Sequence, residues 1–126
     1  MIRAAAVAFV VLAVSELARA DDSEPRFDFT LNCSGCHGLD AHGSASVPTL
    51  VGTGALLSSA KGRDYLIRVP GVAQSPLDDG RLAALMNWML VEIGGATNLT
   101  PYTAAEVGRL RKDPLRDPQQ VRAALP

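Results

Sequence analysis

Cys33-Ser34-Gly35-Cys36-His37 is the most informative run in this chain of 126 residues. Its two cysteines stand three positions apart, about one helical turn, so both thiols can reach the two vinyl groups along one edge of a porphyrin. A C-x-x-C-H run in an exported chain is the attachment signature of a c-type haem. The neutral imidazole of His37 is then an axial ligand of the iron. The run therefore predicts one covalent haem c (heme c), attached through Cys33 and Cys36, with His37 on one face of the iron.

Cysteines at this spacing also occur in three other kinds of site. Cys33, Cys36, His37 and His42 form a formal zinc-binding set, but usual zinc spacings separate the cysteine pair from the histidine pair by a longer stretch. A dithiol redox centre of the thioredoxin type needs a strand-helix-strand context, which the flanking sequence lacks. A structural disulfide between the two cysteines is the plainest alternative. Haem attachment is favoured over all three.

Residues 1–20 have the pattern of a secretory signal peptide. Arg3 supplies the positive start, an apolar stretch runs from Ala4 to Val14, and Ala18-Arg19-Ala20 resembles a cleavage site. The apolar stretch is shorter than the roughly 18 residues that a membrane-spanning helix needs, so an uncleaved anchor is the weaker alternative. We therefore expect a soluble, exported, periplasmic protein with no membrane span in the mature chain.

Composition and charge give no sign of a nucleic-acid partner. The formal net charge is -1 at pH 7, whereas nucleic-acid-binding domains carry a basic surface. The stretch from Arg109 onwards is locally basic, which is typical of a solvated helix face or of a patch that steers an acidic partner. A chain this short buries limited surface on folding, and a bound cofactor is a common source of extra stability.

Hydrophobic spacing and loop residues predict helices and no strands. A helix over 27–36 leads into the cysteine run, with Phe27 and Leu31 on a common face. Glycines and prolines indicate that the chain after the motif is irregular. A short helix is then expected from Lys61 to Val69, ended by Pro70-Gly71.

The longest predicted helix runs from about Pro76 to Ile93. Ser75 is a suitable N-cap, a proline suits the first helical position, and Gly94-Gly95 ends the helix. Two shorter helices follow, one opened by a capping box from Thr103 to Glu106 and one by Asp117-Pro118. The apolar stripe of the long helix must face a core, and it consists of Leu82, Leu85, Met86, Met89, Leu90 and Ile93.

With these motifs the chain resembles the class I c-type cytochromes, small monohaem cytochromes c, over about residues 26–93. In that family an N-terminal helix carries C-x-x-C-H, here followed by Gly38, and a later helix packs across it. The resemblance implies an all-α, cytochrome c-like helical domain wrapped around one covalently bound haem. The expected organisation is a signal peptide over 1–20, a cytochrome c domain over 21–96 and a C-terminal helical extension over 97–126.

The resemblance also assigns residues to the haem pocket. Val47-Pro48-Thr49-Leu50 resembles the family's proline-containing loop, whose proline carbonyl accepts a hydrogen bond from the axial imidazole. Pro48 would then orient His37 and raise its basicity, and a plain turn proline is an equal alternative. Leu50, again by resemblance, would lie against the face of the haem.

The resemblance, or the chemistry of the side chain itself, suggests a role for four further residues. Trp88 stands where the family carries an aromatic residue on the last core helix, packed on the N-terminal helix near Phe27 or Leu31. Guanidinium and phenol groups bond carboxylates well, and the plainer alternative for such side chains is a solvated loop position. Three of them could reach the haem propionates: Arg63, Tyr65 and Arg68.

The sixth iron ligand departs from the family pattern. Class I cytochromes usually supply a methionine from the loop before the last helix, whereas this chain has Val69-Pro70 and no methionine or histidine over 66–77. A thioether ligand would be Met89, whose position in the family lines the pocket, or else Met86, although methionine on an apolar stripe is commonly core filler. His42 is tethered too closely to the axial histidine to reach the opposite face. An open distal site is the alternative.

One main hypothesis and two alternatives follow for the function. The main hypothesis is an electron-transport protein, not an enzyme, that carries one electron from a periplasmic dehydrogenase to a cytochrome or oxidase. With an open distal site, the chain would be a haem-based small-ligand binder or a peroxidase-like enzyme, although no distal acid-base group is evident. The third hypothesis is a dedicated cytochrome subunit of a larger oxidoreductase, with the segment from Thr97 onwards wrapped around its partner.

Overall fold

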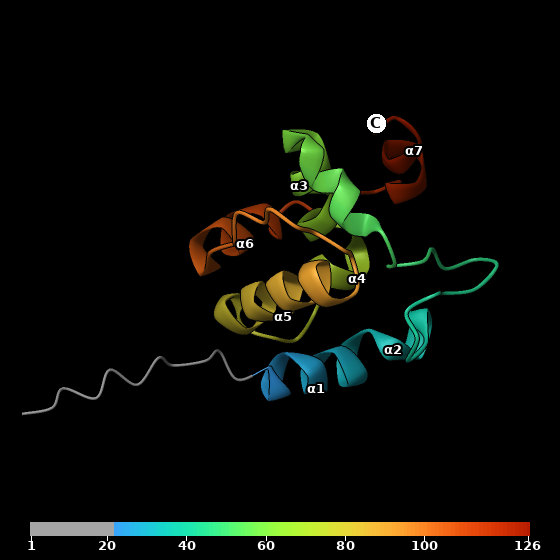
Figure 1. Ribbon diagram of the computed structural model, residues 1–126. Coiled ribbons are helices and arrows are strands. Elements are labelled where there is room, and N and C mark those ends of the chain that lie inside the picture. Colours follow the sequence, from blue (N-terminus) through green and yellow to red (C-terminus); the bar gives the residue numbers. More distant parts are fainter. Residues whose placement is uncertain (1–21) are drawn as a thin grey trace, which may run out of the picture.

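The structure, a computed structural model, describes residues 22–126 as helices joined by loops (Figure 1). The predicted signal peptide lies outside these residues. The described part of the chain contains no strand, so the all-α prediction is confirmed, and none of its helices is long and apolar enough to cross a membrane. In chain order the helices are α1 (Ser23–Asn32), α2 (Ser34–His37), the 3-10 helix η1 (Thr53–Ser58), α3 (Ala60–Arg68), α4 (Pro70–Ala73), α5 (Asp79–Glu92), α6 (Ala104–Leu110) and α7 (Pro118–Ala123).

The single helix predicted over 27–36 is wrong, because the structure has two helices there. Cys33 leaves the helical region between α1 and α2, with φ -121° and ψ -40°. Phe27 and Leu31 do share a face of α1, but this face points to solvent, where they are 58% and 64% exposed. Phe29 is buried instead. The core-facing side of α1 is therefore the side opposite the predicted apolar pair.

α5 begins at Asp79 and not at Pro76. Its N-cap is Asp78, whose Oδ1 accepts the backbone N–H of Arg81 at 2.9 Å. The hydroxyl of Ser75, the predicted cap, accepts a backbone N–H only two residues later, which makes a turn before the helix. A carboxylate caps the helix and also interacts favourably with the positive end of its dipole, so Asp78 takes the role.

Side-chain caps open three further helices, and a proline opens a fourth. Ser59, Thr103 and Asp117 each accept a backbone N–H from the residue three positions later, and they open α3, α6 and α7. The helix starts expected at Thr103 and Asp117 are confirmed. Pro70 follows the end of α3, as predicted, and is also the first residue of α4, because proline fits the first position of a helix.

α5 is the central helix of the fold, with α1 and α6 both packed on it. Phe29 of α1 lies against Trp88 of α5, with ring centroids 5.9 Å apart and planes tilted by 58°. Trp88 thus packs on the N-terminal helix, and its partner is Phe29 instead of Phe27 or Leu31. The guanidinium of Arg26 lies 5.3 Å from the centroid of the indole. The buried apolar side chains of α5 include Leu82, Ala83, Leu85, Met86, Met89 and Leu90.

The segment after residue 97 contains two short helices, α6 and α7, and it packs on the same core. Tyr102, Val107 and Leu110 are all buried. α6 contacts α5 and α3, and α7 contacts α3. These three side chains are therefore part of the core of the chain itself.

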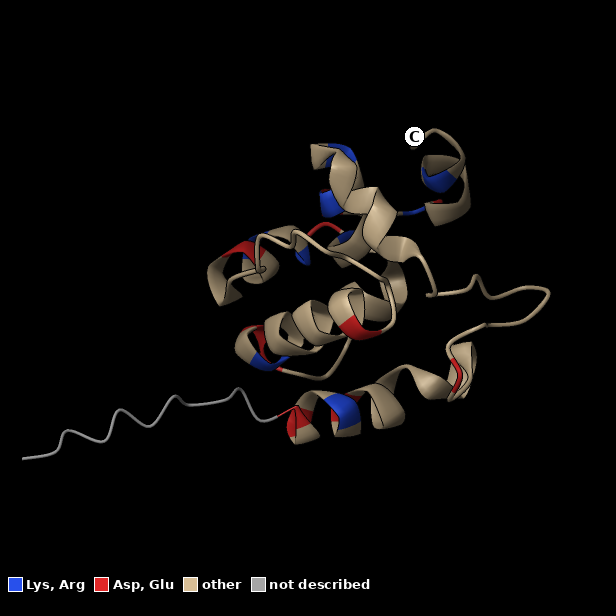
Figure 2. Cartoon of the chain, in the orientation of Figure 1, with Lys and Arg blue, Asp and Glu red and all other residues tan. Residues whose placement is uncertain are grey.

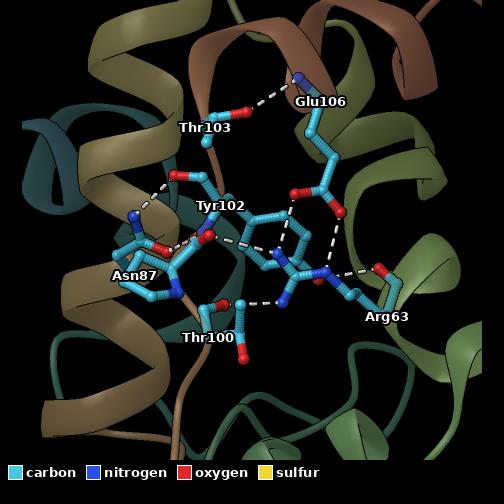
Figure 3. A network of polar contacts seen from close by, with 7 residues as sticks. Arg63, Asn87, Thr100, Tyr102, Thr103 and Glu106 are labelled. Carbon is cyan, nitrogen blue, oxygen red and sulfur yellow. Dashed lines mark hydrogen bonds and ion pairs between the residues drawn. The ribbon is translucent and has the colours of Figure 1, made fainter.

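Arginine side chains connect the segment after residue 97 to the rest of the molecule. Basic residues are frequent both on α3 and after α5 (Figure 2). Arg63 of α3 donates to both carboxylate oxygens of Glu106 at 2.7 Å and to the carbonyl of Thr100 at 2.7 Å (Figure 3). Its guanidinium also lies 3.9 Å from the ring centroid of Tyr102. The Tyr102 hydroxyl donates to the Arg63 carbonyl at 2.7 Å, and the side chain of Asn87 bonds both backbone polar groups of Tyr102.

Two further arginines extend this attachment. Arg111 donates to three backbone carbonyls within residues 73–77 and to Oδ1 of Asp79 at 3.1 Å. Arg68 donates to Oδ2 of Asp113 at 2.6 Å and to the Asp113 carbonyl at 2.7 Å. The chain from α6 onwards therefore holds both α3 and the loop that precedes α5.

Candidate cofactor-attachment site

α2 brings the cysteines and the histidine of the motif into one helical turn. The backbone N–H groups of His37 and Cys36 both donate to the Cys33 carbonyl, at 3.0 and 3.2 Å. Cys36 is exposed, and Cys33 is half-buried and packs against the core. Both cysteines are free thiols. The structure thus places the three residues within one helical turn, and it does not contain the disulfide of the plainest alternative.

The surroundings of Cys33 argue against a reactive thiolate. Burial, followed by electrostatic interactions with Asp28 and Cys36, raises the pKa of the Cys33 thiol to about 11. This thiol stays protonated at neutral pH. Dithiol redox centres and zinc sites act through thiolates, which occur where the pKa is lowered. The environment of Cys33 therefore does not favour the dithiol redox centre.

The imidazole of His37 is oriented by the backbone of Pro48. Nδ1 of His37 lies 2.9 Å from the Pro48 carbonyl oxygen. A carbonyl can only accept, so Nδ1 donates the proton in this hydrogen bond. In the neutral imidazole this tautomer leaves the lone pair on Nε2. A histidine that ligates a metal through one nitrogen commonly donates its other N–H to a carbonyl in this way. The hydrogen bond implied by the resemblance is therefore present, and a role of Pro48 in a haem pocket stays a prediction.

The loop between α2 and Pro48 is folded back by Gly43. The Gly43 N–H donates to the His37 carbonyl at 2.8 Å, and the Ser44 N–H donates to the Val47 carbonyl at 2.8 Å. Gly43 has φ +73°, and a Cβ placed on it would lie 2.2 Å from the Val47 oxygen. Only glycine fits both this backbone conformation and this close approach. Nothing in the sequence distinguishes Gly43 from the other glycines after the motif, and only the structure identifies it as the residue that returns Pro48 to His37.

The other predicted pocket residues lie at or in the core. Leu50 is half-buried and packs against the core cluster, and its backbone N–H donates to the Ala41 carbonyl at 2.9 Å. Met86 and Met89 are 3% and 4% exposed and belong to the core. Such burial suits apolar filler, and iron ligation by Met89 or Met86 stays a prediction.

His42 does not join the other possible metal ligands. Its Nδ1 donates to the Asp40 carbonyl at 2.9 Å and lies 3.6 Å from Oδ2 of the same residue, and the imidazole is 70% exposed. Across residues 22–126, no three His, Cys, Asp or Glu side chains converge as a metal-binding group. The zinc-binding set considered from the sequence is therefore not assembled in the structure.

The side chains considered for the propionates are on α3 and not in a loop. Arg63 and Arg68 are paired with Glu106 and Asp113, which lie 43 and 45 positions away in the chain. The hydrogen bond to Glu106 raises the pKa of Arg63, and burial raises the pKa of the half-buried Tyr65. Sequence analysis missed both ion pairs because spacing along the chain carries no signal for partners this far apart.

A cleft of about 640 Å³ lies between η1 and the residues that follow α5. Its lining includes Val51, Leu57, Ile93 and Ala96, and none of the motif residues. A second cleft of about 320 Å³ lies between α1 and α5, and it also lacks them. The attachment site is therefore defined by the side chains of α2 and the Pro48 loop, and not by either cleft.

No protein-family model and no curated protein matches this chain. The functional assignment therefore depends on the chemistry of the motif and on the geometry around His37.

Proposed function

We propose that this protein is a periplasmic monohaem c-type cytochrome that carries one electron at a time between redox partners. The observation that carries the proposal is the hydrogen bond from Nδ1 of His37 to the Pro48 carbonyl. It leaves Nε2 free as a ligand directly after two free cysteines at the attachment spacing. This combination is what a histidine-ligated, thioether-linked haem requires of the chain.

The cysteines would hold the cofactor covalently. Each thiol adds across one vinyl double bond, so that sulfur bonds to one carbon and the thiol hydrogen goes to the other. Neither an oxidant nor a leaving group is needed. Cys36 is exposed and Cys33 is at the edge of the core, so one side of the attachment faces solvent and the other faces the interior.

His37 and Pro48 would hold the iron. Nε2 of His37 would be the ligand of the metal, and the hydrogen bond from Nδ1 to the Pro48 carbonyl would fix the ring and make Nε2 more basic. When bound, the haem supplies the one-electron chemistry, because its iron alternates between the ferric and ferrous states. The chain itself sets solvent access and charge around the iron.

The predicted signal peptide supports a periplasmic location, where the electron donor would be a dehydrogenase and the acceptor a cytochrome or an oxidase. Such encounters are brief and bury little surface. The weak net charge of the chain supports protein partners and not nucleic acid.

A small-ligand binder or peroxidase-like enzyme is the second candidate, and the loop before α5 favours it. This loop has no methionine or histidine, and Met86 and Met89 are packed in the core. A vacant sixth position binds small molecules, whereas a methionine ligand raises the reduction potential and suits electron transfer.

Absorption spectra of the exported, purified protein test the proposal. We expect the wild-type protein to show the spectrum of a haem with two thioether links. Cys33→Ala or Cys36→Ala should change it to the spectrum of a haem with one thioether link, and His37→Ala should weaken the ligation of the iron. A wild-type protein without a haem spectrum contradicts the proposal. A ferric methionine-to-iron band that disappears in Met89→Ala or Met86→Ala supports electron transfer, whereas a high-spin ferrous form that binds carbon monoxide at once supports the second candidate.

A further inference from the structure

A buried ion pair connects α5 to α1, the helix that ends next to Cys33. Asp28 of α1 is only 2% exposed. Its two carboxylate oxygens accept hydrogen bonds from Arg81 of α5, at 2.5 Å from Nη2 and 3.2 Å from Nε. Glu24 lies 3.4 Å from the same guanidinium, which is 41% exposed. The pair thus has one charge inside the protein and the other at its surface.

Stability alone gives a weak reason for this pair. Taking a carboxylate out of water is costly, and replacing a buried ion pair by packed apolar residues is often neutral or stabilising. The α1–α5 contact already has an aromatic pair, Phe29 and Trp88, and the apolar side chains of α5. A buried charge at this interface therefore points to a role in which the charge itself matters.

Asp28 is close in sequence to the cysteine run. It lies five residues before Cys33, which corresponds to about 7–8 Å along a helix axis. The carboxylate also contributes to the raised pKa of the Cys33 thiol, so its field reaches that side chain. A charge in a poorly solvated position is screened much less than one at the surface.

We propose that Asp28 and Arg81 form a tuning pair that sets the reduction potential of the haem attached at Cys33 and Cys36. This inference rests on the proposed function. Reduction adds one negative charge to the iron site, so the carboxylate of Asp28 disfavours it and the guanidinium of Arg81 favours it. Because the two charges are close together, most of their effects cancel in the native protein. Removing one partner exposes the effect of the other.

Three variants of the full-length, haem-loaded protein test the tuning pair by equilibrium redox titration. Asp28→Asn keeps the size of the side chain and removes the negative charge, and it should raise the potential. Arg81→Gln removes the positive charge and should lower it. Arg81→Lys keeps the charge but loses the two-point contact, and it should weaken folding in urea while leaving the potential close to that of the native protein.

Asp113→Asn is the matched control, because Asp113 also pairs with an arginine but is 83% exposed and sits after α6. Its shift in potential should be much smaller than that of Asp28→Asn. Equal shifts in Asp28→Asn and Asp113→Asn overturn the inference, as do shifts of the same sign in Asp28→Asn and Arg81→Gln. If either Asp28→Asn or Arg81→Gln fails to fold, the sign of the shift in reduction potential in the other variant still tests the tuning pair. A protein that carries no haem overturns the proposed function and the tuning pair together, whereas a haem protein with unshifted variants overturns only the tuning pair.

Discussion

A single hydrogen bond at the residue scale separates this motif from an ordinary pair of cysteines. In the proposed function His37 would bind iron through Nε2, with its other ring nitrogen hydrogen-bonded to the Pro48 carbonyl. That carbonyl is in place because the chain turns back at Gly43, in a conformation that L-residues with a side chain avoid. The chemistry of the histidine therefore depends on a residue that has no side chain.

Gly43→Ala should destabilise the protein by about 2 kcal/mol or more, as measured by urea unfolding. A side chain in the left-handed region costs about 1–2 kcal/mol, and the new Cβ would also collide with the Val47 carbonyl at 2.2 Å. Gly52→Ala is the matched control. Gly52 has φ +81°, and a Cβ added to it would meet no atom within 4 Å, so this variant should show only the conformational cost. Equal losses in the two variants would show that the close approach at Gly43 is unimportant.

At the element scale, the crossing of α1 and α5 holds the start of the attachment site. Phe29→Ala should cost about 3–5 kcal/mol in urea unfolding, because a buried aromatic side chain is replaced by a cavity. Phe27→Ala, in the same helix, should change stability by no more than about 0.5 kcal/mol, because Phe27 is 58% exposed. A larger loss in Phe27→Ala than in Phe29→Ala would contradict the orientation of α1.

The contact between α3 and α6 should respond to acid through Glu106. The hydrogen bond from Arg63 lowers the pKa of Glu106 below its ordinary value of 4.5. Because the folded-state pKa is the lower one, the stabilisation is complete above pH 4.5 and is lost as the pH falls through the folded-state pKa. Urea unfolding at a series of pH values should show this loss in the native protein and a flatter profile in Glu106→Gln. Identical profiles would mean that the Arg63–Glu106 pair does not contribute.

Sequence reasoning succeeded for local features of these elements and failed for distant ones. The helical class, the caps at Thr103 and Asp117 and the pairing of Pro48 with His37 all follow from short motifs or from the family resemblance. The start of α5 was missed because Ser75 and Asp78 both suit an N-cap, and only the folded chain selects between them. The direction in which Phe27 points depends on where α5 lies, which spacing within α1 does not encode.

At the scale of the whole molecule, the C-terminal segment is part of the folded core. Removing residues 97–126 should abolish the cooperative unfolding transition, because Tyr102, Val107 and Leu110 are buried. At about 1.5–3 kcal/mol for each buried apolar side chain, the loss approaches the total stability of a typical domain. Removing only residues 118–126 should be tolerated, because α7 has no buried residue. Thermal unfolding monitored by circular dichroism compares the two deletion variants. A cooperative transition in the variant that lacks residues 97–126 would contradict the assignment of this segment to the core.

The intact mass of the exported, purified protein under denaturing conditions tests the central claim most directly. We expect the mass of the mature chain plus one haem, with the added mass located on the peptide that contains Cys33 and Cys36. The haem should remain attached after the protein is unfolded, since thioether links survive denaturation. A mass equal to that of the chain alone, with two free thiols or one disulfide, would contradict the assignment.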